Sequence, residues 1–337
     1  MKILIIGCRE ETNIGGSFER AASQLGLIPH LMNANLAFEA PWVVRKLSWH
    51  YLGHLPPKFN QFSRSVEKKC KEFKPAWILS IGISPLHKHA LETIGNLGIK
   101  RLNFLTDDPW SKNHRAQWFF DVLPLYDTIF SPRRSNIKDL KNLGCKDVQY
   151  LSFAVDTSLF YPMFSLSPET LRKYSCDIMF AGGADNDRIA YMDALIKARF
   201  KLSLYGIHWE RYAQTKLYTH GQANVTTMRT AIASAKIALC LVRRSNRDGH
   251  SMRTFEIPAV GTCMLTEDTE EHRDIFGKEG SAVLYFKNIY EMVNKTKFLL
   301  NNEQERRRLA KAAQDLINNG KHTYQYRLAC MLDKKFN

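Results

Sequence analysis

The stretch KIALCLVRRSNRDGHSMRTFEIPAVGTCMLT, residues 236–266, predicts one complete strand–helix–strand unit. Residues 236–242 are mostly apolar and run into a basic loop that contains Gly249, which is typical of a buried strand. A short helix is expected over 252–260, stopped by Gly261, and a second strand over 263–266. Two short strands joined through a helix favour parallel pairing, so this stretch predicts an α/β fold.

The same alternation recurs along the whole chain. Strands are expected at 2–6, 29–32, 76–81, 101–106, 128–131 and 148–153, and again at 176–181, 202–205, 236–242, 263–266 and 283–286. Asp156, Pro162 and Pro168 belong to a turn-rich stretch between the two series. We therefore expect a first domain over 1–155, a linker over 156–170, a second domain over 171–318 and a final helical segment over 319–337.

Length and composition agree with two globular domains. A chain of 337 residues exceeds the size at which one core usually divides. Its seven cysteines are an odd number without C-x-x-C spacing, which argues against a disulfide framework or a zinc site and favours the cytoplasm. The sequence shows no apolar run that resembles a membrane span or a signal peptide.

The net charge of +15 favours an anionic partner: phosphates, an anionic lipid surface or nucleic acid. Nucleic acid is disfavoured, because the excess charge is spread over both halves and no binding motif is recognisable. Residues 41–74 interleave eight cations and two acids with aromatic side chains. Such a segment can contact an anionic membrane or a lipid-linked acceptor. The favoured alternative is that its aromatics pack on the sheet and its lysines are solvated.

The first strand is followed by a glycine-containing loop. The loop closes at Gly15-Gly16, after which apolar residues recur at helical spacing. Glycines let the backbone approach a ligand, and the free N–H groups of a helix start favour an anion. Eight residues separate Gly7 from Gly16, which does not fit the dinucleotide fingerprint and disfavours an NAD enzyme. The alternative is that these glycines only turn the chain.

The strand at 101–106 runs into the acidic turn Asp107-Asp108-Pro109-Trp110. Ligands of parallel α/β sheets bind at the carboxyl ends of strands. Asp107, Asp108 and His114 are therefore candidate catalytic or acceptor-binding groups. The alternative is that one aspartate caps a following helix that has Pro109 at its first position, and the favoured interpretation is that one aspartate caps while the other is functional.

Corresponding strand ends of the second half carry glycines and cations. Gly182-Gly183 and Gly206 follow two of the strands, and Arg188 enters the helix after the glycine pair. In the quoted stretch, Ser251 is placed to cap the helix, whose first N–H groups would then face a diphosphate. Arg253 is placed for a forked phosphate contact and Glu256 for the hydroxyls of a ribose. Pro258 predicts that this helix is short or kinked. The alternative is a solvated basic loop with Glu256 in a surface ion pair.

The residues HSMRTFEIPAVG at 250–261 resemble the CgeB-like, spore maturation type of glycosyltransferases, which are related to the large retaining family 4. Supporting matches are Gly15-Gly16, residues 153–156 with Phe160 and Pro162, and His322-Thr323-Tyr324 with Arg327. The resemblance implies the GT-B architecture. In that architecture two Rossmann-like, doubly wound parallel-sheet domains face a central cleft, and the last helix crosses back to the first domain.

The resemblance also implies an activity: transfer of a sugar from a nucleoside-diphosphate sugar, such as a UDP- or GDP-sugar, to a glycan, lipid-linked or protein acceptor. No metal or other cofactor is expected, and no D-x-D motif is present. The expected acceptor-side catalytic residues are Asp107, Asp108 and His114. The expected donor-binding residues are Gly15, Gly16, Gly182, Gly183, Arg188, Gly206, Arg243, His250, Ser251, Met252, Arg253 and Glu256.

One position departs from the family pattern. Gly249 stands seven residues before Glu256, where the family usually has a second glutamate. Two alternatives therefore stay open: a non-catalytic protein of the same architecture that binds a nucleotide sugar or an anionic polymer, and a sugar-nucleotide epimerase.

Overall fold

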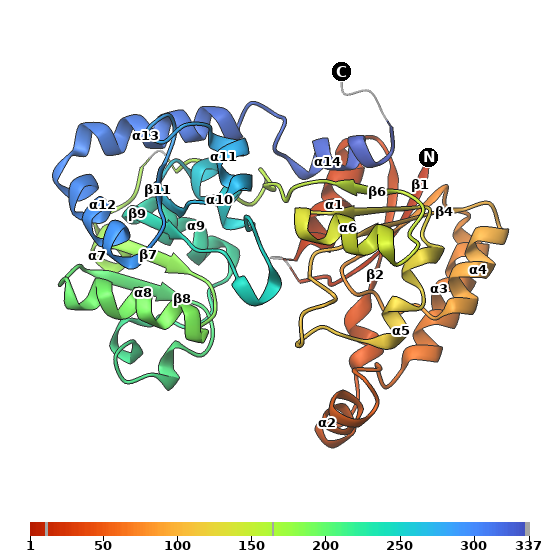
Figure 1. The fold of residues 1–337 in the computed structure, drawn as a ribbon. Coiled ribbons are helices and arrows are strands. Elements are labelled where there is room, and N and C mark those ends of the chain that lie inside the picture. The colour runs from red at the N-terminus through yellow and green to blue at the C-terminus, as the bar shows by residue number, and fades with distance from the viewer. Residues whose placement is uncertain (11–12, 164, 334–337) are drawn as a thin grey trace. The chain divides into compact units, whose positions relative to one another are not determined.

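Two parallel sheets organise the chain, one in each of two units (Figure 1). The computed structural model describes residues 1–10, 13–163 and 165–333. The first unit comprises Met1–Ser152, Ser245–Arg247 and Tyr324–Asn337, and the second comprises Phe153–Arg244 and Asp248–Thr323. The α/β class with two parallel-sheet domains is therefore confirmed.

The first unit contains a six-stranded parallel sheet in the order β2-β1-β3-β4-β5-β6. Its strands are β1 (Lys2–Gly7), β2 (Ile28–Asn33), β3 (Trp77–Ile81), β4 (Lys100–Phe104), β5 (Thr128–Ser131) and β6 (Val148–Tyr150). Ile5 of β1 pairs with Leu31 on one side and with Leu79 on the other. Ile3 to Ile6 are fully buried, as a strand covered on both faces requires.

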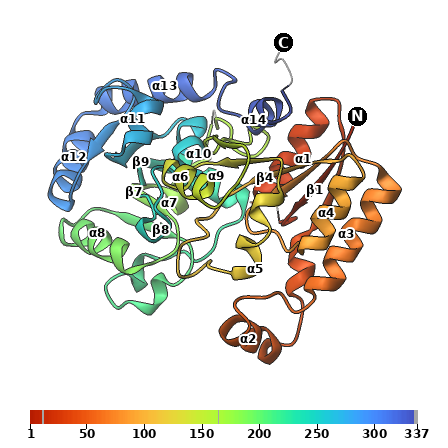
Figure 2. The same cartoon turned by 45° about the vertical axis from the view of Figure 1, so that its right-hand side comes forward.

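Helices cover both faces of this sheet. They are α1 (Ile14–Gln24), η1 (Ala34–Phe38), α2 (Trp42–Tyr51), α3 (Phe59–Phe73), α4 (Lys88–Asn96), α5 (Gln117–Phe120), η2 (Leu123–Leu125), α6 (Arg134–Asn142) and α14 (Tyr324–Met331). Phe62 of α3 and Leu91 of α4 belong to the core cluster of one face (Figure 2). Phe18 of α1 meets Phe104 edge-on at 5.5 Å and Tyr324 of α14 at 5.1 Å. The last helix thus belongs to the first unit.

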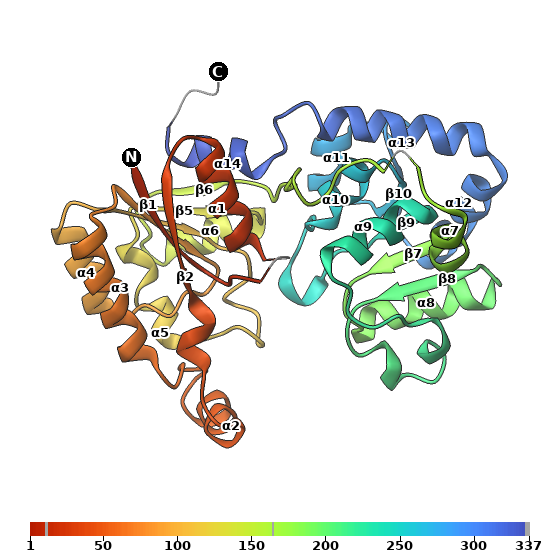
Figure 3. The same cartoon turned by 180° about the vertical axis from the view of Figure 1, so that it is seen from behind.

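The second unit contains a five-stranded parallel sheet in the order β11-β10-β9-β7-β8. Its strands are β7 (Cys176–Ala181), β8 (Leu202–Tyr205), β9 (Ala235–Cys240), β10 (Cys263–Glu267) and β11 (Leu284–Phe286). Its helices are α7 (Pro168–Tyr174), α8 (Asn186–Lys197), η3 (Trp209–Arg211), η4 (Lys216–Tyr218), α9 (Val225–Ser234), α10 (Arg253–Val260), α11 (Glu270–Phe276), α12 (Ile289–Asn301) and α13 (Glu303–Ile317). The short turn η5 (Arg244–Asn246) follows β9. In Figure 3, α7 lies beside α9 over this sheet.

The turn at Asp107-Asp108 corrects one prediction. The capping alternative is wrong, because no helix begins there and the next one is α5. The Asp108 carboxylate instead accepts the N–H of Trp110 at 3.1 Å, which closes a local turn. Two long-range donors, Asn136 and Arg247, also hold this carboxylate, so it is fixed by tertiary contacts.

The basic and aromatic segment 41–74 corrects another. The prediction that its aromatic side chains are buried is right for Phe62 of α3, which is 4% exposed. It is wrong for Trp42 of α2, which is 66% exposed. In α2 only Ser48 is buried. The apolar side chains of α2 therefore do not pack on the sheet.

Gly206 provides a test of the loop packing in the second unit. Its φ is +136°, and an added Cβ would lie 2.3 Å from the carbonyl oxygen of Gly182. We expect Gly206→Ala to lower the free energy of unfolding by roughly 2–4 kcal/mol, because backbone strain and a clash with main chain combine. Gly98→Ala is the control, since φ is +76° there but the space is open. It should cost only about 1–2 kcal/mol. Urea unfolding measures both, and equal losses would contradict the clash.

Candidate functional site

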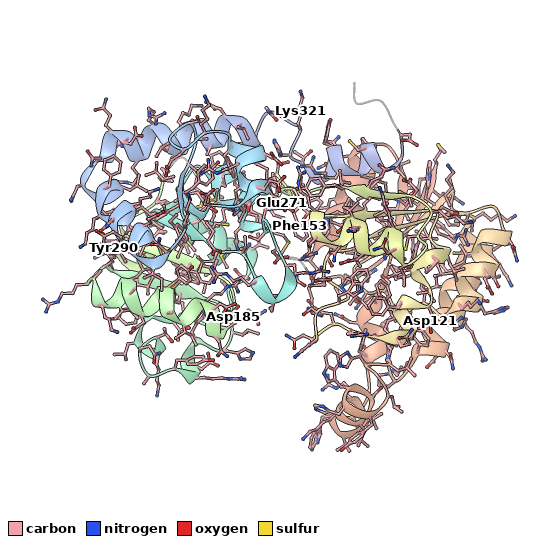
Figure 4. The ribbon with its side chains drawn as sticks, in the orientation of Figure 1. Asp121, Phe153, Asp185, Glu271, Tyr290 and Lys321 are labelled. Atoms are coloured by element: carbon pink, nitrogen blue, oxygen red, sulfur yellow. The ribbon has the colours of Figure 1, made fainter. Side chains whose placement is uncertain are left out.

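The carboxyl ends of β7 and β9 carry most of the predicted donor-binding residues. This edge of a parallel sheet is where ligands bind in α/β folds. Asp185 begins α8 after β7, and Glu271 lies in α11 after β10; both are labelled in Figure 4. The loop after β9 leads into α10, which holds Arg253 and Glu256.

The start of α11 fixes the loop before α10. The Thr269 hydroxyl caps α11 by accepting the His272 N–H at 3.0 Å, and it donates to the Gly249 carbonyl at 2.6 Å. A single hydroxyl thus satisfies an orphan helix amide and holds the backbone of the neighbouring loop.

The His250 ring connects this loop to two residues distant in sequence, Phe153 and Glu271. The Phe153 N–H donates to His250 Nε2 at 3.0 Å, so Nδ1 carries the ring proton and donates to Glu271 Oε2 at 2.5 Å. The ring is fully buried, and Phe153 and Glu271 appear near one another in Figure 4. Both ring nitrogens are used within the protein. If His250 contacts a nucleotide-sugar donor, it would therefore do so through its backbone.

A second buried histidine continues the network. His272 Nδ1 lies 2.9 Å from the Glu267 carbonyl, which can only accept, so Nε2 is free to accept the Thr254 hydroxyl at 3.0 Å. Burial lowers the pKa of His272, which agrees with a neutral ring. The Thr254 oxygen also accepts the Ser251 N–H at 3.1 Å.

The start of α10 differs from the sequence prediction. Ser251 does not cap the helix, whose cap residue is Met252 and has no side-chain bond. The amide of Ser251 is already used by Thr254, and the Ser251 hydroxyl lies 3.7 Å from Cys240 Sγ. In the part of the chain that the structure describes, the amides of Met252 and Arg253 have no acceptor. These two N–H groups are therefore available for an anion.

Arg253 and Glu256 form an ion pair on α10. Burial lowers the pKa of Arg253 to about 10, so the guanidinium still carries its charge at neutral pH. Its Nε is buried without a hydrogen-bond acceptor among the described residues. The pair does not fit the alternative of a solvated surface contact, since Glu256 is 6% exposed.

Arg188 is a second buried cation at this edge. It donates from Nη1 to the Gly183 carbonyl at 3.0 Å and lies 3.4 Å from Asp185 through Nε. Burial lowers the pKa of Arg188; Asp185 opposes this effect, and the charge of Arg243 adds to it. Arg188 Nε also lacks a hydrogen-bond acceptor in the described chain. Buried guanidinium donors without acceptors are suited to an anionic ligand.

Gly182 and Gly206 allow the loops after β7 and β8 to pass each other closely. The Gly182 carbonyl accepts Trp209 Nε1 at 2.8 Å, and the Gly206 N–H donates to Gly221 at 2.8 Å. An added Cβ at Gly183 would meet Ile207 at 3.3 Å. These glycines therefore shape the loop; their role in donor binding stays a prediction.

Two carboxylates of this edge were missed. Glu267 ends β10, accepts the Val242 N–H at 2.6 Å and pairs with Arg244 at 2.9 Å. Burial raises its pKa against the effect of those partners. Glu271 is the other. Both lie within five residues of the expected strand 263–266, so an acid at a strand's carboxyl end was the available signal.

Glu271 fills the space beside Gly249. An ideal Cβ on Gly249 would lie 2.4 Å from the Glu271 Cδ. A side chain at position 249 would thus begin where the Glu271 carboxylate now stands. A carboxylate from α11 therefore lies beside position 249.

In the first unit, α1 begins at Ile14, one residue before the glycine pair. An added Cβ on Gly15 would lie 2.8 Å from the Cys8 carbonyl, so this glycine lets the helix start approach β1 closely. Gly16 meets only the Arg20 side chain. The amides of residues 14–16 have no acceptor among the described residues.

Asp107 and His114 come together at the carboxyl edge of the first sheet. His114 Nε2 lies 3.7 Å from Asp107 Oδ1, and both side chains are about one third exposed. Thr106 donates to Asp107 at 3.2 Å. Burial raises the pKa of the neighbouring Cys8 thiol, and the charges of Glu10 and Asp107 raise it further. A solvent-accessible Asp–His pair is a suitable proton acceptor.

Asp108 is in a different environment. It is 1% exposed, and its carboxylate accepts from Asn136 at 2.8 Å and from Arg247 at 2.5 and 2.9 Å. Burial acts to raise the pKa of Asp108, but Arg247, the Trp110 amide and Asn136 outweigh it, so the pKa is lowered. The geometry favours Asp107 over Asp108 as a proton acceptor.

The described residues form no group of three or more His, Cys, Asp or Glu side chains placed to hold a metal ion. In the same residues, no helix combines the length and apolar character that crossing a membrane requires.

Residues 188–333 match a family model described as glycosyl transferase-like. No curated protein matches the chain. Among solved structures, Anabaena HepE in complex with UDP and glucose aligns with a TM-score of 0.64 at 13% identity, over 99% of both chains. Sucrose-phosphate synthase from Thermosynechococcus elongatus aligns with a TM-score of 0.68 at 11% identity, over 99% of this chain and 98% of that one. The structure of S. aureus MnaA with UDP aligns with a TM-score of 0.59 at 13% identity, over 100% of both chains.

These likenesses confirm the GT-B fold. The matched segment contains Arg188, Arg253, Glu256 and Glu271, and it begins at Arg188. The CgeB-like subtype stays a prediction.

Thr254→Val tests whether the polar network holds the loop. The variant keeps the shape but leaves the Ser251 N–H without its acceptor and His272 Nε2 with only the Thr266 hydroxyl, at 3.5 Å. We expect a loss of roughly 2–4 kcal/mol in the free energy of unfolding, measured by denaturant titration. The matched control is Thr230→Val, where the hydroxyl only donates to a carbonyl of its own helix, Thr226, and the loss should stay near 0.5 kcal/mol. Similar losses in the two variants would contradict the idea that the Thr254 network holds the loop.

Proposed function

We propose that this protein is a glycosyltransferase that moves a sugar from a nucleoside-diphosphate sugar to an acceptor. The observation that carries the proposal is the presence at one sheet edge of two arginines, the buried Arg188 and the partly buried Arg253, each with a buried Nε, and of the α10 amides that have no acceptor among the described residues. This set is built for a multiply charged anion. It lies in the segment that matches the glycosyl transferase-like family, and HepE and MnaA were solved with UDP.

The second unit would bind the donor. The amides of Met252 and Arg253 and the guanidinium of Arg188 would contact the diphosphate, with Arg243 beside them. Glu256, one turn into α10, would accept the ribose hydroxyls once ligand binding draws Arg253 toward phosphate. The arrangement favours a diphosphate over a monophosphate, because several separate donors converge on it.

Glu271 would take the place of the missing second carboxylate. Its position beside Gly249 supports contact with the sugar, directly or through the His250 backbone that it holds. This role requires a neutral His250, as its bond from the Phe153 amide dictates.

The chemistry needs charge stabilisation at the leaving group. Cleavage of the anomeric carbon–oxygen bond leaves negative charge on the nucleoside diphosphate, and fixed guanidinium and amide donors stabilise it in the transition state. We propose that these donors do so without a metal ion.

The first unit would bind the acceptor, a glycan, a lipid-linked sugar or a protein. Asp107 with His114 would take the proton of the attacking hydroxyl. Asp108 would hold the acidic turn in place.

Glu256→Gln tests donor binding. The amide keeps the size but cannot accept two hydroxyls as a carboxylate does, so we expect the Kd for the preferred nucleoside diphosphate to rise about 10- to 100-fold, in line with the loss of charged hydrogen bonds. Isothermal titration against UDP, GDP, ADP and dTDP measures it. Glu303→Gln, an exposed ion-pair residue on α13, is the control and should leave Kd unchanged. Unchanged affinity in Glu256→Gln would remove the assigned role.

Asp107→Asn tests the acceptor side. We expect kcat to fall by roughly 10²- to 10⁴-fold, the usual contribution of a general base, with the donor Kd unchanged. The measurement is release of nucleoside diphosphate in the presence of candidate acceptors. Conversion of the donor sugar without an acceptor would indicate an epimerase. Binding without any turnover would indicate a nucleotide-sugar binding protein.

A further inference from the structure

Helix α2 exposes an unusual amount of apolar surface. Seven apolar side chains on it or directly after it are at least 44% exposed: Trp42, Val43, Val44, Leu47, Trp49, Tyr51 and Leu52. Ser48 alone of the helix is buried, and it bonds to the Leu55 carbonyl. All three ribbon views show α2 at one end of the first unit, away from its sheet (Figures 1, 2 and 3).

These apolar side chains surround the helix. At 100° per residue, Trp42 and Trp49 point to one side, Leu47 and Tyr51 to the opposite side. A helix that is apolar all round is normally buried. A contiguous patch of this kind indicates a surface that binds something else.

The charges of the segment identify the partner. Arg45 and Lys46 lie among the apolar residues, and Lys58 and Arg64 follow, whereas residues 40–66 contain no aspartate or glutamate. A protein face presents both signs of charge, but an anionic bilayer presents one. Tryptophan and tyrosine also prefer the interface between headgroups and acyl chains.

We propose that α2 binds the surface of an anionic membrane. The helix lies in the plane of the headgroups with Trp42 and Trp49, which share one side of it, inserted toward the acyl chains. Arg45 and Lys46 extend along the helix to lipid phosphates. The proposal goes beyond the proposed function and does not depend on it, because donor binding is assigned to the second unit.

Vesicle flotation of the whole protein tests the proposal. One set of vesicles contains 30% phosphatidylglycerol in phosphatidylcholine, and the other contains phosphatidylcholine alone. We expect flotation with the first set and at least 10-fold weaker binding to the second. Trp42→Ser/Trp49→Ser and Arg45→Glu/Lys46→Glu should each weaken binding to the anionic vesicles at least 10-fold. These side chains are exposed, so thermal unfolding should match the unaltered protein.

Lys68→Glu/Lys71→Glu provides the matched control, because it reverses two exposed cations of α3 in the same unit. It should lower binding less than 3-fold. Equal loss in this control would overturn the proposal in favour of general charge attraction. Absence of flotation would also overturn it. So would self-association, seen by light scattering and abolished by the serine variant, without vesicle binding.

Discussion

Parallel pairing is the constraint on which both units depend. Strands buried on both faces satisfy their backbone groups with their neighbours, so unused N–H groups are left only where the chain leaves the sheet and enters a helix. Among the residues that the structure describes, both units have amides without an acceptor at the same kind of place, at the start of α1 and of α10. The chemistry of the protein is therefore confined to strand-end loops, and each loop is as well defined as the contacts that hold it.

In the second unit those contacts form one connected network. Thr269 holds the Gly249 carbonyl, Glu271 holds His250, and His272 holds Thr254, so the cap residue and two residues of α11 together fix the loop before α10. Because the ordering is completed during folding, little conformational entropy remains to be lost when an anion reaches the free amides.

The strands and their order of appearance were predictable, because a strand covered on both faces must be a continuous apolar run, as in residues 2–6 and 176–181. The placement of Arg188, Arg253 and Glu256 after strand ends of one sheet was predictable from the strand pattern, and their role in donor binding stays a prediction. The cap at Ser251, the cap at Asp107-Asp108 and the burial of Trp42 were wrong. Each outcome depends on contacts between residues distant in sequence. The Ser251 N–H bonds to Thr254, which His272 holds in place, and Arg247 holds Asp108. In α2, the exposed apolar side chains lack such contacts with the sheet. Glu271 was missed for the same reason.

The composition of the first unit has a consequence for biosynthesis. Its sheet is complete once residue 150 has been made, yet α14, which covers Phe18 through Tyr324, follows the second unit in the chain and is made after it. Domains usually fold as they leave the ribosome, amino-terminal end first. Here the nascent first unit must wait with an apolar face of α1 uncovered while the entire second unit is synthesised. Transiently exposed apolar surface of this kind favours aggregation, and a chain that stops before residue 324 keeps that face of α1 uncovered.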